Sequence, residues 1–253
     1  MTSHRERILD QFTRQAVPFA TAPSIRSQES LDRIVRLSEA GPSDLVLDVA
    51  CGPGLLVCTF AKVVAHATGI DITPAMLEQA RREQERLAIQ NVTWHCGDVL
   101  PLTYADASFS IVTARFAFHH FPDPASVLLE MRRVCKTGGC VLVADSAPQR
   151  EKADAFNRME RLRDPSHVRA MPPEELAAMF HQAGFEATRT DSYRLEGELE
   201  EFLGRSFPGE GDADRIRRMF ADSLDGDGMD LAVRLRDGKF HFGFPVVILA
   251  SQK

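Results

Sequence analysis

The stretch that begins at residue 44 limits the possible folds of this chain more than any other part of the sequence. Residues 44–50 (DLVLDVA) form a short apolar run with β-branched residues, and a glycine-containing turn, CGPG, follows at 51–54. A run of this kind is typical of a strand buried in a parallel sheet. The apolar residues 55–64 predict a helix that packs on the same sheet.

The alternation of strands and helices continues to residue 145. Two further helices are predicted to begin at Thr73-Pro74 and Asp123-Pro124, and Gly138-Gly139 is expected to end the second. Because this order requires right-handed crossovers and helices on both faces, we predict a doubly wound α/β fold with a mostly parallel sheet. The additional strands are predicted at 67–72, 91–97, 109–114 and 140–145.

The alternation is less regular after residue 145. The segments that follow are a charged, arginine-rich stretch at 149–169, a helix at 172–184, a strand at 185–195 and an acidic region with two short helices at 196–238. Residues 240–250 predict a final strand, in which Pro245 favours an edge position or a bulge because proline donates no ladder hydrogen bond. No linker divides the chain, so we expect one domain over residues 1–253.

Composition excludes several classes of protein. The chain has 30 Lys and Arg residues against 36 Asp and Glu, a formal net charge of -6, which disfavours general binding to nucleic acid. The N-terminal residues hold no signal peptide, and no segment is apolar and long enough to cross a bilayer. The five cysteines form no CxxC pair, which fits a reducing compartment. We expect a cytoplasmic protein without stable membrane insertion.

Carboxylates follow three of the predicted strands. Open α/β sheets bind ligands at the carboxyl ends of their strands, so Asp48, Asp71 and Asp98 are candidate ligand contacts. A carboxylate at position 48 suits a cation better than a pyrophosphate. The dinucleotide fingerprint is absent, since Ala50 and Leu55 stand where its first and last glycines would be. These residues therefore predict a nucleoside-like, cationic ligand.

Each of these residues has a specific expected contact and an ordinary alternative. Asp71 can accept hydrogen bonds from a ribose diol, or it can cap a helix. Asp98 can accept from the amine of adenine beside Val99, or it can be a turn residue. Met76 can pack on the nucleoside, or it can belong to the core. Three carboxylates at three successive strand ends favour the ligand over the alternatives.

Five motifs in this chain resemble those of class I S-adenosylmethionine-dependent methyltransferases, with the nearest likeness in the ubiquinone/menaquinone biosynthesis branch. They are VLDVACGPG, GIDITPAML, GDVLPL, ASFSIVTARFAFHHFPDP and RRVCKTGGCVLVAD, and the resemblance covers about residues 10–190. It implies a seven-stranded Rossmann-like sheet with a reversed last strand. It also implies S-adenosylmethionine as cofactor and S-adenosylhomocysteine as product.

The resemblance further implies which residues hold the cofactor and which segments cover the site. A lid is expected at about 10–40, and substrate-side insertions at about 149–170 and 196–238. The region 196–238 could also form a homodimer surface. The expected cofactor-binding residues are Phe19, Asp48, Ala50, Cys51, Gly52, Gly54, Asp71, Ile72, Met76, Gly97, Asp98, Val99, Ala114 and Arg115.

Two clusters are candidates for the chemistry. The loop at 114–121 is expected to face the transferring methyl group, and His119 and His120 beside Arg115 are its candidate catalytic residues, with His120 preferred for a place in the active site. The acceptor could also need a base, which the sequence does not identify. The alternative for each histidine is a packing role. Arg163 and His167 in the second cluster suit an anionic or enol-like acceptor, unless this is only a solvated loop. No metal site is expected.

The predicted function is methyl transfer to a small-molecule acceptor whose identity the sequence does not specify. One alternative is a module that binds the cofactor without catalysing transfer. A less favoured alternative is a nicotinamide-dependent oxidoreductase, which would need a phosphate-cradling glycine at position 50 and no carboxylate at position 98.

Overall fold

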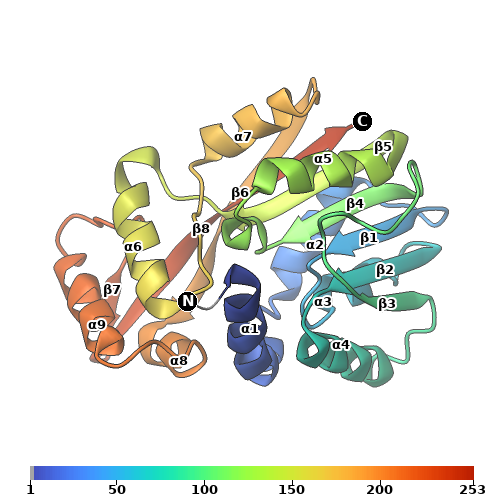
Figure 1. The fold of residues 1–253 in the computed structure, drawn as a ribbon. Coiled ribbons are helices and arrows are strands. Elements are labelled where there is room, and N and C mark those ends of the chain that lie inside the picture. Colours follow the sequence, from blue (N-terminus) through green and yellow to red (C-terminus); the bar gives the residue numbers. More distant parts are fainter. Residues whose placement is uncertain (1–2) are drawn as a thin grey trace.

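The protein is described by a computed structural model that covers residues 3–253. Its centre is an eight-stranded sheet in the order β3-β2-β1-β4-β5-β8-β6, with the short β7 paired to β8 (Figure 1). The strands are β1 (Leu45–Val49), β2 (His66–Asp71), β3 (Val92–Cys96), β4 (Phe109–Arg115), β5 (Cys135–Ser146), β6 (Thr188–Glu198), β7 (Arg234–Arg236) and β8 (Lys239–Gln252).

The strand directions confirm the predicted doubly wound fold. β1 to β5 pair in parallel, while β8 runs antiparallel to both β5 and β6. The last strand is therefore reversed, as expected. Seven strands form the continuous order, and the eighth, β7, is a three-residue strand that pairs with the start of β8.

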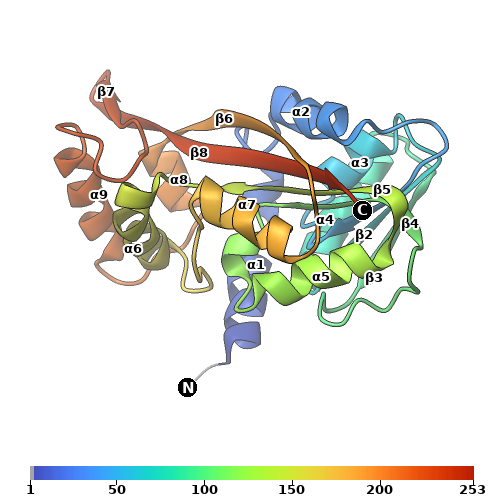
Figure 2. The same ribbon diagram turned by 90° about the horizontal axis from the view of Figure 1, so that it is seen from above.

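Helices cover both faces of the sheet. Figure 2 shows α2 and α3 on one face and α5 and α7 on the other. The inward positions of α5 are Val127, Leu128, Met131 and Val134, all fully buried as the sequence predicted. The helices are α1 (His4–Thr21), α2 (Gln28–Ser38), α3 (Leu55–Phe60), α4 (Pro74–Arg86), α5 (Pro124–Val134), α6 (Ala153–Arg163), α7 (Pro173–Gln182), α8 (Leu199–Gly204) and α9 (Asp212–Asp222), with 3-10 turns η1 (Phe118–His120) and η2 (Arg150–Lys152).

Two groups of helices lie outside the two covering layers. In Figure 1, α1 lies between α4 and the group formed by α6, α8 and α9. That group gathers at the end of the long β6 and β8 strands that lies beside β7 (Figure 2). Phe202, Ile216 and Phe220 of this group are buried in one core cluster with Phe242 of β8. Apolar burial thus attaches region 196–238 to the sheet.

The structure corrects several local predictions. The helix expected at 55–64 ends at Phe60, and the charged stretch 149–169, for which no helix was predicted, contains α6. The helix before Gly138-Gly139 ends at Val134, because Cys135 is already extended and pairs with Phe109 of β4. In residues 3–253, no helix is both long and apolar enough to cross a membrane.

The expected edge position of Pro245 is also wrong, because β8 lies between β5 and β6. The carbonyl of Pro245 accepts a hydrogen bond from Ala147 N at 2.8 Å, so its nitrogen faces the β5 side. The last residue pair of the β5–β8 ladder is Ser146 with Val246, so Pro245 lies one residue beyond the paired part of β8 on this side. The proline therefore lies where no ladder donor is required.

Candidate active site

A cavity of about 270 Å³ opens at the carboxyl ends of β1, β2 and β4, and residues of α1 line its opposite side. Parallel sheets offer this edge to ligands because the loops after neighbouring strands meet there. The predicted site residues that line the cavity are Phe19, Asp48, Ala50, Cys51, Gly52, Asp71, Ile72, Met76, Asp98, Val99, Arg115 and His120.

The turn after β1 has three left-handed residues. Ala50, Gly52 and Gly54 have φ angles of 54°, 53° and 72°. A Cβ built on Gly52 would meet nothing within 4 Å, so this side of the turn is open. A Cβ on Gly54 would lie 2.5 Å from the Trp94 ring, so Gly54 allows close packing and lies outside the cavity lining.

Asp71 ends β2 with its carboxylate held by the backbone. Oδ2 accepts a hydrogen bond from Gly52 N at 2.8 Å, and Oδ1 accepts one from Thr73 N at 2.8 Å. Burial raises the pKa of Asp71, while these two N–H groups oppose the shift. Because each carboxylate oxygen has two acceptor positions, one remains free on each oxygen. Asp71 can thus organise its loop and still accept two hydrogen bonds from a ligand.

Asp48 is a second buried carboxylate in the same cavity, and it is 2% exposed. The Thr113 hydroxyl donates to its Oδ1 at 2.8 Å. Burial raises the pKa of Asp48 to about 7, although Thr113 and the nearby Arg115 act in the opposite direction. A cation beside Asp48 would favour the charged carboxylate, so this position suits a positively charged ligand group.

Asp98 lines the cavity from the loop after β3, and Met76 lines it from the start of α4. Asp98 Oδ1 accepts a hydrogen bond from Val99 N at 2.7 Å, and Oδ2 lies 3.8 Å from Arg5 Nε of α1. Met76 is 2% exposed in the first turn of α4, so it serves the core and the cavity wall together. Asp98 is therefore both a turn residue and a lining residue, and Met76 is both a core residue and a lining residue.

Two other predicted cofactor residues do not line the cavity. Gly97 N donates to the Asp71 carbonyl at 3.1 Å and so holds the ends of β3 and β2 together. Ala114 lies in β4 and is fully buried in the core. Both residues support the strand ends from which Asp71 and Arg115 project.

Arg115 ends β4 and lies at the cavity wall. Its Nη2 donates to the Ile25 carbonyl at 3.0 Å and to Ser30 Oγ at 3.3 Å. The guanidinium also lies over the Phe116 ring, 4.6 Å from the ring centre. These contacts tie the strand end to α2 and the segment before it.

His120 is the only one of the three predicted histidines that lines the cavity. Its Nδ1 faces Ser166, 3.1 Å from the carbonyl oxygen and 3.2 Å from Oγ. Nε2 forms no hydrogen bond within residues 3–253. This atom is also not completely buried, because it is absent from the fully buried polar atoms that lack a partner. Burial lowers the pKa of His120 to about 3, and the nearby His119 adds to the effect. His120 is therefore a lining residue with a neutral ring, and its Nε2 has no hydrogen-bond partner among residues 3–253.

His119 does not line the cavity and pairs with Asp145. Its Nδ1 lies 2.5 Å from Asp145 Oδ1, and its backbone N donates to Asp145 Oδ2 at 3.2 Å. Burial lowers the pKa of His119, but the charge and hydrogen bond of Asp145 more than offset this, so the pKa is raised overall. The packing alternative describes this histidine better than contact with a ligand.

Arg163 and His167 also lie outside the cavity lining. Arg163 is buried against Glu160, with Nη2 and Oε2 2.7 Å apart. His167 Nε2 lies 2.7 Å from Asn157 Oδ1, and burial lowers the pKa of this histidine. The arginine expected to meet an anionic acceptor thus has its charge neutralised by its own helix.

Sequence reasoning missed most of the wall that α1 contributes. Ile8 and Phe12 face the cavity, and His4 Nε2 lies 2.8 Å from the His120 carbonyl. Ser3 and Glu6 form a capping box, and this S-x-x-E pattern was the available signal for the helix. The lining residues outside every segment expected at the site are His4, Arg5, Ile8, Leu55, Leu56, Thr73, Leu100, Pro122, Asp123 and Val127. Phe12 and Ile25 lie in the expected lid, Pro53 in the expected turn, and Phe116, Ala117 and Phe121 in the expected loop at 114–121.

Comparison with known proteins places this geometry in a family. A model described as a methyltransferase domain matches residues 47–143, which include the end of β1 and all of β2, β3 and β4. The uncharacterized methyltransferase YcgJ of Bacillus subtilis (strain 168) is 34% identical over 171 residues, covering 67% of this chain and 68% of that protein. The chain belongs to the class I S-adenosylmethionine-dependent methyltransferases.

Solved structures share the fold of this methyltransferase. The crystal structure of YcgJ has a TM-score of 0.81 at 26% identity, with 89% of this chain and 98% of that chain covered. A putative methyltransferase from Bacillus halodurans C-125 has a TM-score of 0.81 at 28% identity, with 89% of this chain and 99% of that chain covered.

A further relative matches by sequence over a shorter segment. The demethylmenaquinone methyltransferase of Chlorobaculum parvum is 38% identical over 101 residues, which are 40% of this chain and 40% of that protein.

Membership confirms the predicted enzyme class and its cofactor, S-adenosylmethionine. It also excludes the nicotinamide-dependent alternative. No group of three or more potential metal ligands that could hold an ion occurs in the part of the chain that the structure describes.

Proposed function

We propose that this methyltransferase transfers the methyl group of S-adenosylmethionine to a small, neutral acceptor whose proton His120 removes. The observation that carries the proposal is the unpaired Nε2 of His120 in the cavity that also contains Asp48 and Asp71. One cavity thus combines groups suited to the cofactor with a base.

The carboxylates of the cavity fit the three polar parts of S-adenosylmethionine. We assign the ribose hydroxyls to Asp71, the adenine to Asp98 and Val99, and the cationic methionine part to Asp48 and the turn at 50–54. Support comes from the free acceptor positions of Asp71 and from the open space at Gly52. A carboxylate-lined site suits hydroxyls and amines better than phosphates.

The chemistry of the acceptor follows from the rest of the lining. Ile8, Phe12 and Phe121 are apolar, while the two lining arginines already have partners, Arg5 at Asp98 and Arg115 at Ile25 and Ser30. Arg5 thus lies beside a carboxylate, and the Arg115 nitrogen without a partner, Nε, is sealed within the protein. We therefore favour a neutral aromatic acceptor, and the demethylmenaquinone methyltransferase among the relatives makes a quinol-like ring the first to test.

The bound cofactor supplies an electrophilic methyl group on a sulfonium. As the acceptor atom X attacks in line, the X–C bond forms, the C–S bond breaks and its electron pair stays on sulfur. The X–H proton moves to His120 Nε2 and later to water, so atoms and charge balance. The enzyme contributes positioning and a base.

Titration with S-adenosylhomocysteine tests the cofactor assignment. Asp71→Ala is expected to weaken binding at least about tenfold, since both ribose hydrogen bonds are lost, a loss of about 1.4 kcal/mol or more. Calorimetry measures this, with NADH as a ligand control.

Asp227→Ala is a matched protein control, because Asp227 also accepts two backbone N–H bonds, from Leu231 and Ala232, far along the chain. Its affinity for S-adenosylhomocysteine is expected to stay within about threefold of wild type. Equal affinity in Asp71→Ala and Asp227→Ala would rule out the ribose contact.

The pKa of Asp48 predicts a pH dependence of cofactor binding. Since this pKa is raised to about 7, the carboxylate is mostly protonated at pH 6 and mostly charged at pH 8. The amino group of S-adenosylhomocysteine stays cationic over this range, so affinity is expected to rise several-fold from pH 6 to 8. Calorimetry across this range measures it. A wild-type profile as flat as that of Asp48→Asn would contradict the contact.

A further inference from the structure

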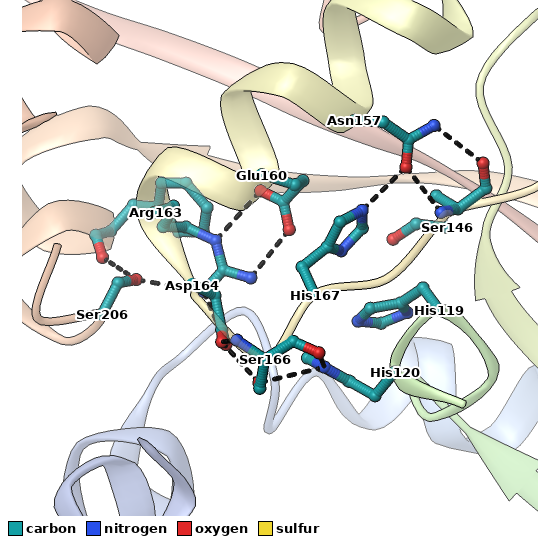
Figure 3. Close-up of polar contacts among 12 residues, drawn as sticks. His119, His120, Ser146, Asn157, Glu160, Arg163, Asp164, Ser166, His167 and Ser206 are labelled. Atoms are coloured by element: carbon teal, nitrogen blue, oxygen red, sulfur yellow. Dashed lines mark hydrogen bonds and ion pairs between the residues drawn. The ribbon is translucent and has the colours of Figure 1, made fainter. Parts of the chain in front are cut away.

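Three buried histidines lie together beside the cavity (Figure 3). Ring centroids are 4.2 Å apart for His119 and His120, and 5.4 Å apart for His119 and His167. The three rings have different polar partners, which are Asp145 for His119, Ser166 for His120 and Asn157 for His167. Of these partners, only Ser166 forms a hydrogen bond to a further carboxylate, that of Asp164. The histidine at the cavity thus has a buried chain of polar groups behind it.

The partners of His120 determine which ring nitrogen carries the proton. The Ser166 carbonyl oxygen, 3.1 Å from Nδ1, accepts hydrogen bonds and donates none, so Nδ1 must be the donor. Ser166 Oγ donates to Asp164 Oδ1 at 2.5 Å, which leaves this oxygen free to accept from Nδ1 as well. With the proton on Nδ1, Nε2 retains its lone pair and can act as a base.

Asp164 is 1% exposed, and its polar neighbours hold it in place. Oδ1 also accepts from Ser166 N at 2.8 Å, and Oδ2 accepts from Gln15 Nε2 of α1 at 3.3 Å. Burial alone would raise its pKa, but the neighbouring His120 and Arg163 and the hydrogen bonds of Ser166 lower it. A charged carboxylate is thus held behind a histidine, although burying a charge is costly.

We propose that Asp164 and Ser166 are positioning residues that keep the proton of His120 on Nδ1 and stabilise the imidazolium formed when Nε2 takes the acceptor's proton. This rests on the proposed role of His120. The neighbouring His119 opposes a second positive charge on His120, so a negative charge relayed through Ser166 makes protonation easier at the moment of transfer. The triad of serine hydrolases uses a carboxylate behind a histidine in a comparable way.

Imidazole nitrogen resonances test the relay without any acceptor. Long-range ¹H–¹⁵N spectra at pH 7, with and without S-adenosylhomocysteine, report the tautomer of His120, which His120→Gln assigns. Wild type is expected to carry the proton on Nδ1. In Asp164→Asn the new amide can donate to Ser166 Oγ, which frees the hydroxyl to donate to Nδ1. The ratio of Nδ1–H to Nε2–H tautomers is then expected to fall at least about threefold.

Glu160→Gln is the matched control, because Glu160 is also a buried carboxylate paired with Arg163 but does not touch Ser166. It is expected to keep the wild-type tautomer ratio while lowering stability. Ser166→Ala tests the hydroxyl bridge and should shift the ratio in the same direction even if Asp164→Asn does not fold. A wild-type proton on Nε2, or unchanged ratios in the folded relay variants, would overturn the relay. A failure to bind S-adenosylhomocysteine would instead overturn the proposed function.

Discussion

Replacing His120 by glutamine is expected to lower kcat by about 10²-fold, the lower end of the usual contribution of a positioned base, because burial makes this imidazole a weak base. Glutamine retains polarity but presents no basic nitrogen to the acceptor. Binding of S-adenosylhomocysteine is expected to stay within about threefold, since no cofactor contact is assigned to His120. Transfer of radiolabelled methyl groups to 1,4-dihydroxynaphthalene, a neutral quinol, measures the loss.

The pH profile adds an independent prediction. Because burial lowers the pKa of His120 to about 3, this base stays neutral above about pH 5, and kcat/KM should show no acid limb from it between pH 5 and 8. His95→Gln is the matched control, because His95 is exposed on β3 and contacts Tyr104 outside the cavity. Unchanged kcat in His120→Gln would remove the base from the mechanism.

Local patterns were sufficient to predict the parallel half of the sheet. A strand buried on both faces must be a short apolar run, so β1, β2 and β4 are visible in sequence. The carboxylates at the ends of β1, β2 and β3 follow from topology. Asp48, Asp71 and Asp98 accordingly line one cavity. Sequence periodicity predicts those strands and helices whose pattern depends on residues close together along the chain.

Contacts between distant segments were not predictable in this way. The partners of His120 lie 46 residues away at Ser166, and no pattern within either segment indicates the pairing. Helix α1, which lines the cavity, buries Gln11 and Gln15. Because these two residues are polar, the buried face of α1 does not form an apolar stripe that a sequence search would detect. These glutamines are satisfied by the Ser206 carbonyl and by Asp164, which lie far along the chain.

Arg163 shows a different kind of error. Its partner Glu160 is three residues away, a spacing that brings side chains together on a helix. Because no helix was predicted over 149–169, this pair was not recognised, and neither was the neutralisation of the arginine. An arginine on a helix can be assigned to a ligand only when no acidic residue three or four positions away on the same helix neutralises its charge.

Gly54→Ala is expected to destabilise the enzyme by about 2–4 kcal/mol, from about 1–3 kcal/mol for overpacking and about 1 kcal/mol for a side chain at positive φ. The new methyl would lie 2.5 Å from the Trp94 ring and 2.7 Å from Ala80. Trp94 is held in place, since its Nε1 donates to Gln84 Oε1 at 2.8 Å, so the turn at the start of α3 must move. Urea unfolding at 25 °C measures the change.

Gly52→Ala separates the two causes of this loss. Gly52 shares the positive φ, but a Cβ there meets nothing within 4 Å. Ala50 in the same turn already carries a methyl group at a φ of 54°. The cost of Gly52→Ala is therefore expected to be about 1 kcal/mol. Trp94→Leu combined with Gly54→Ala should cost less than the sum of the single changes, because the clashing ring is gone. Equal losses for the two glycine variants would show that the packing of Gly54 against Trp94 does not determine the shape of the turn.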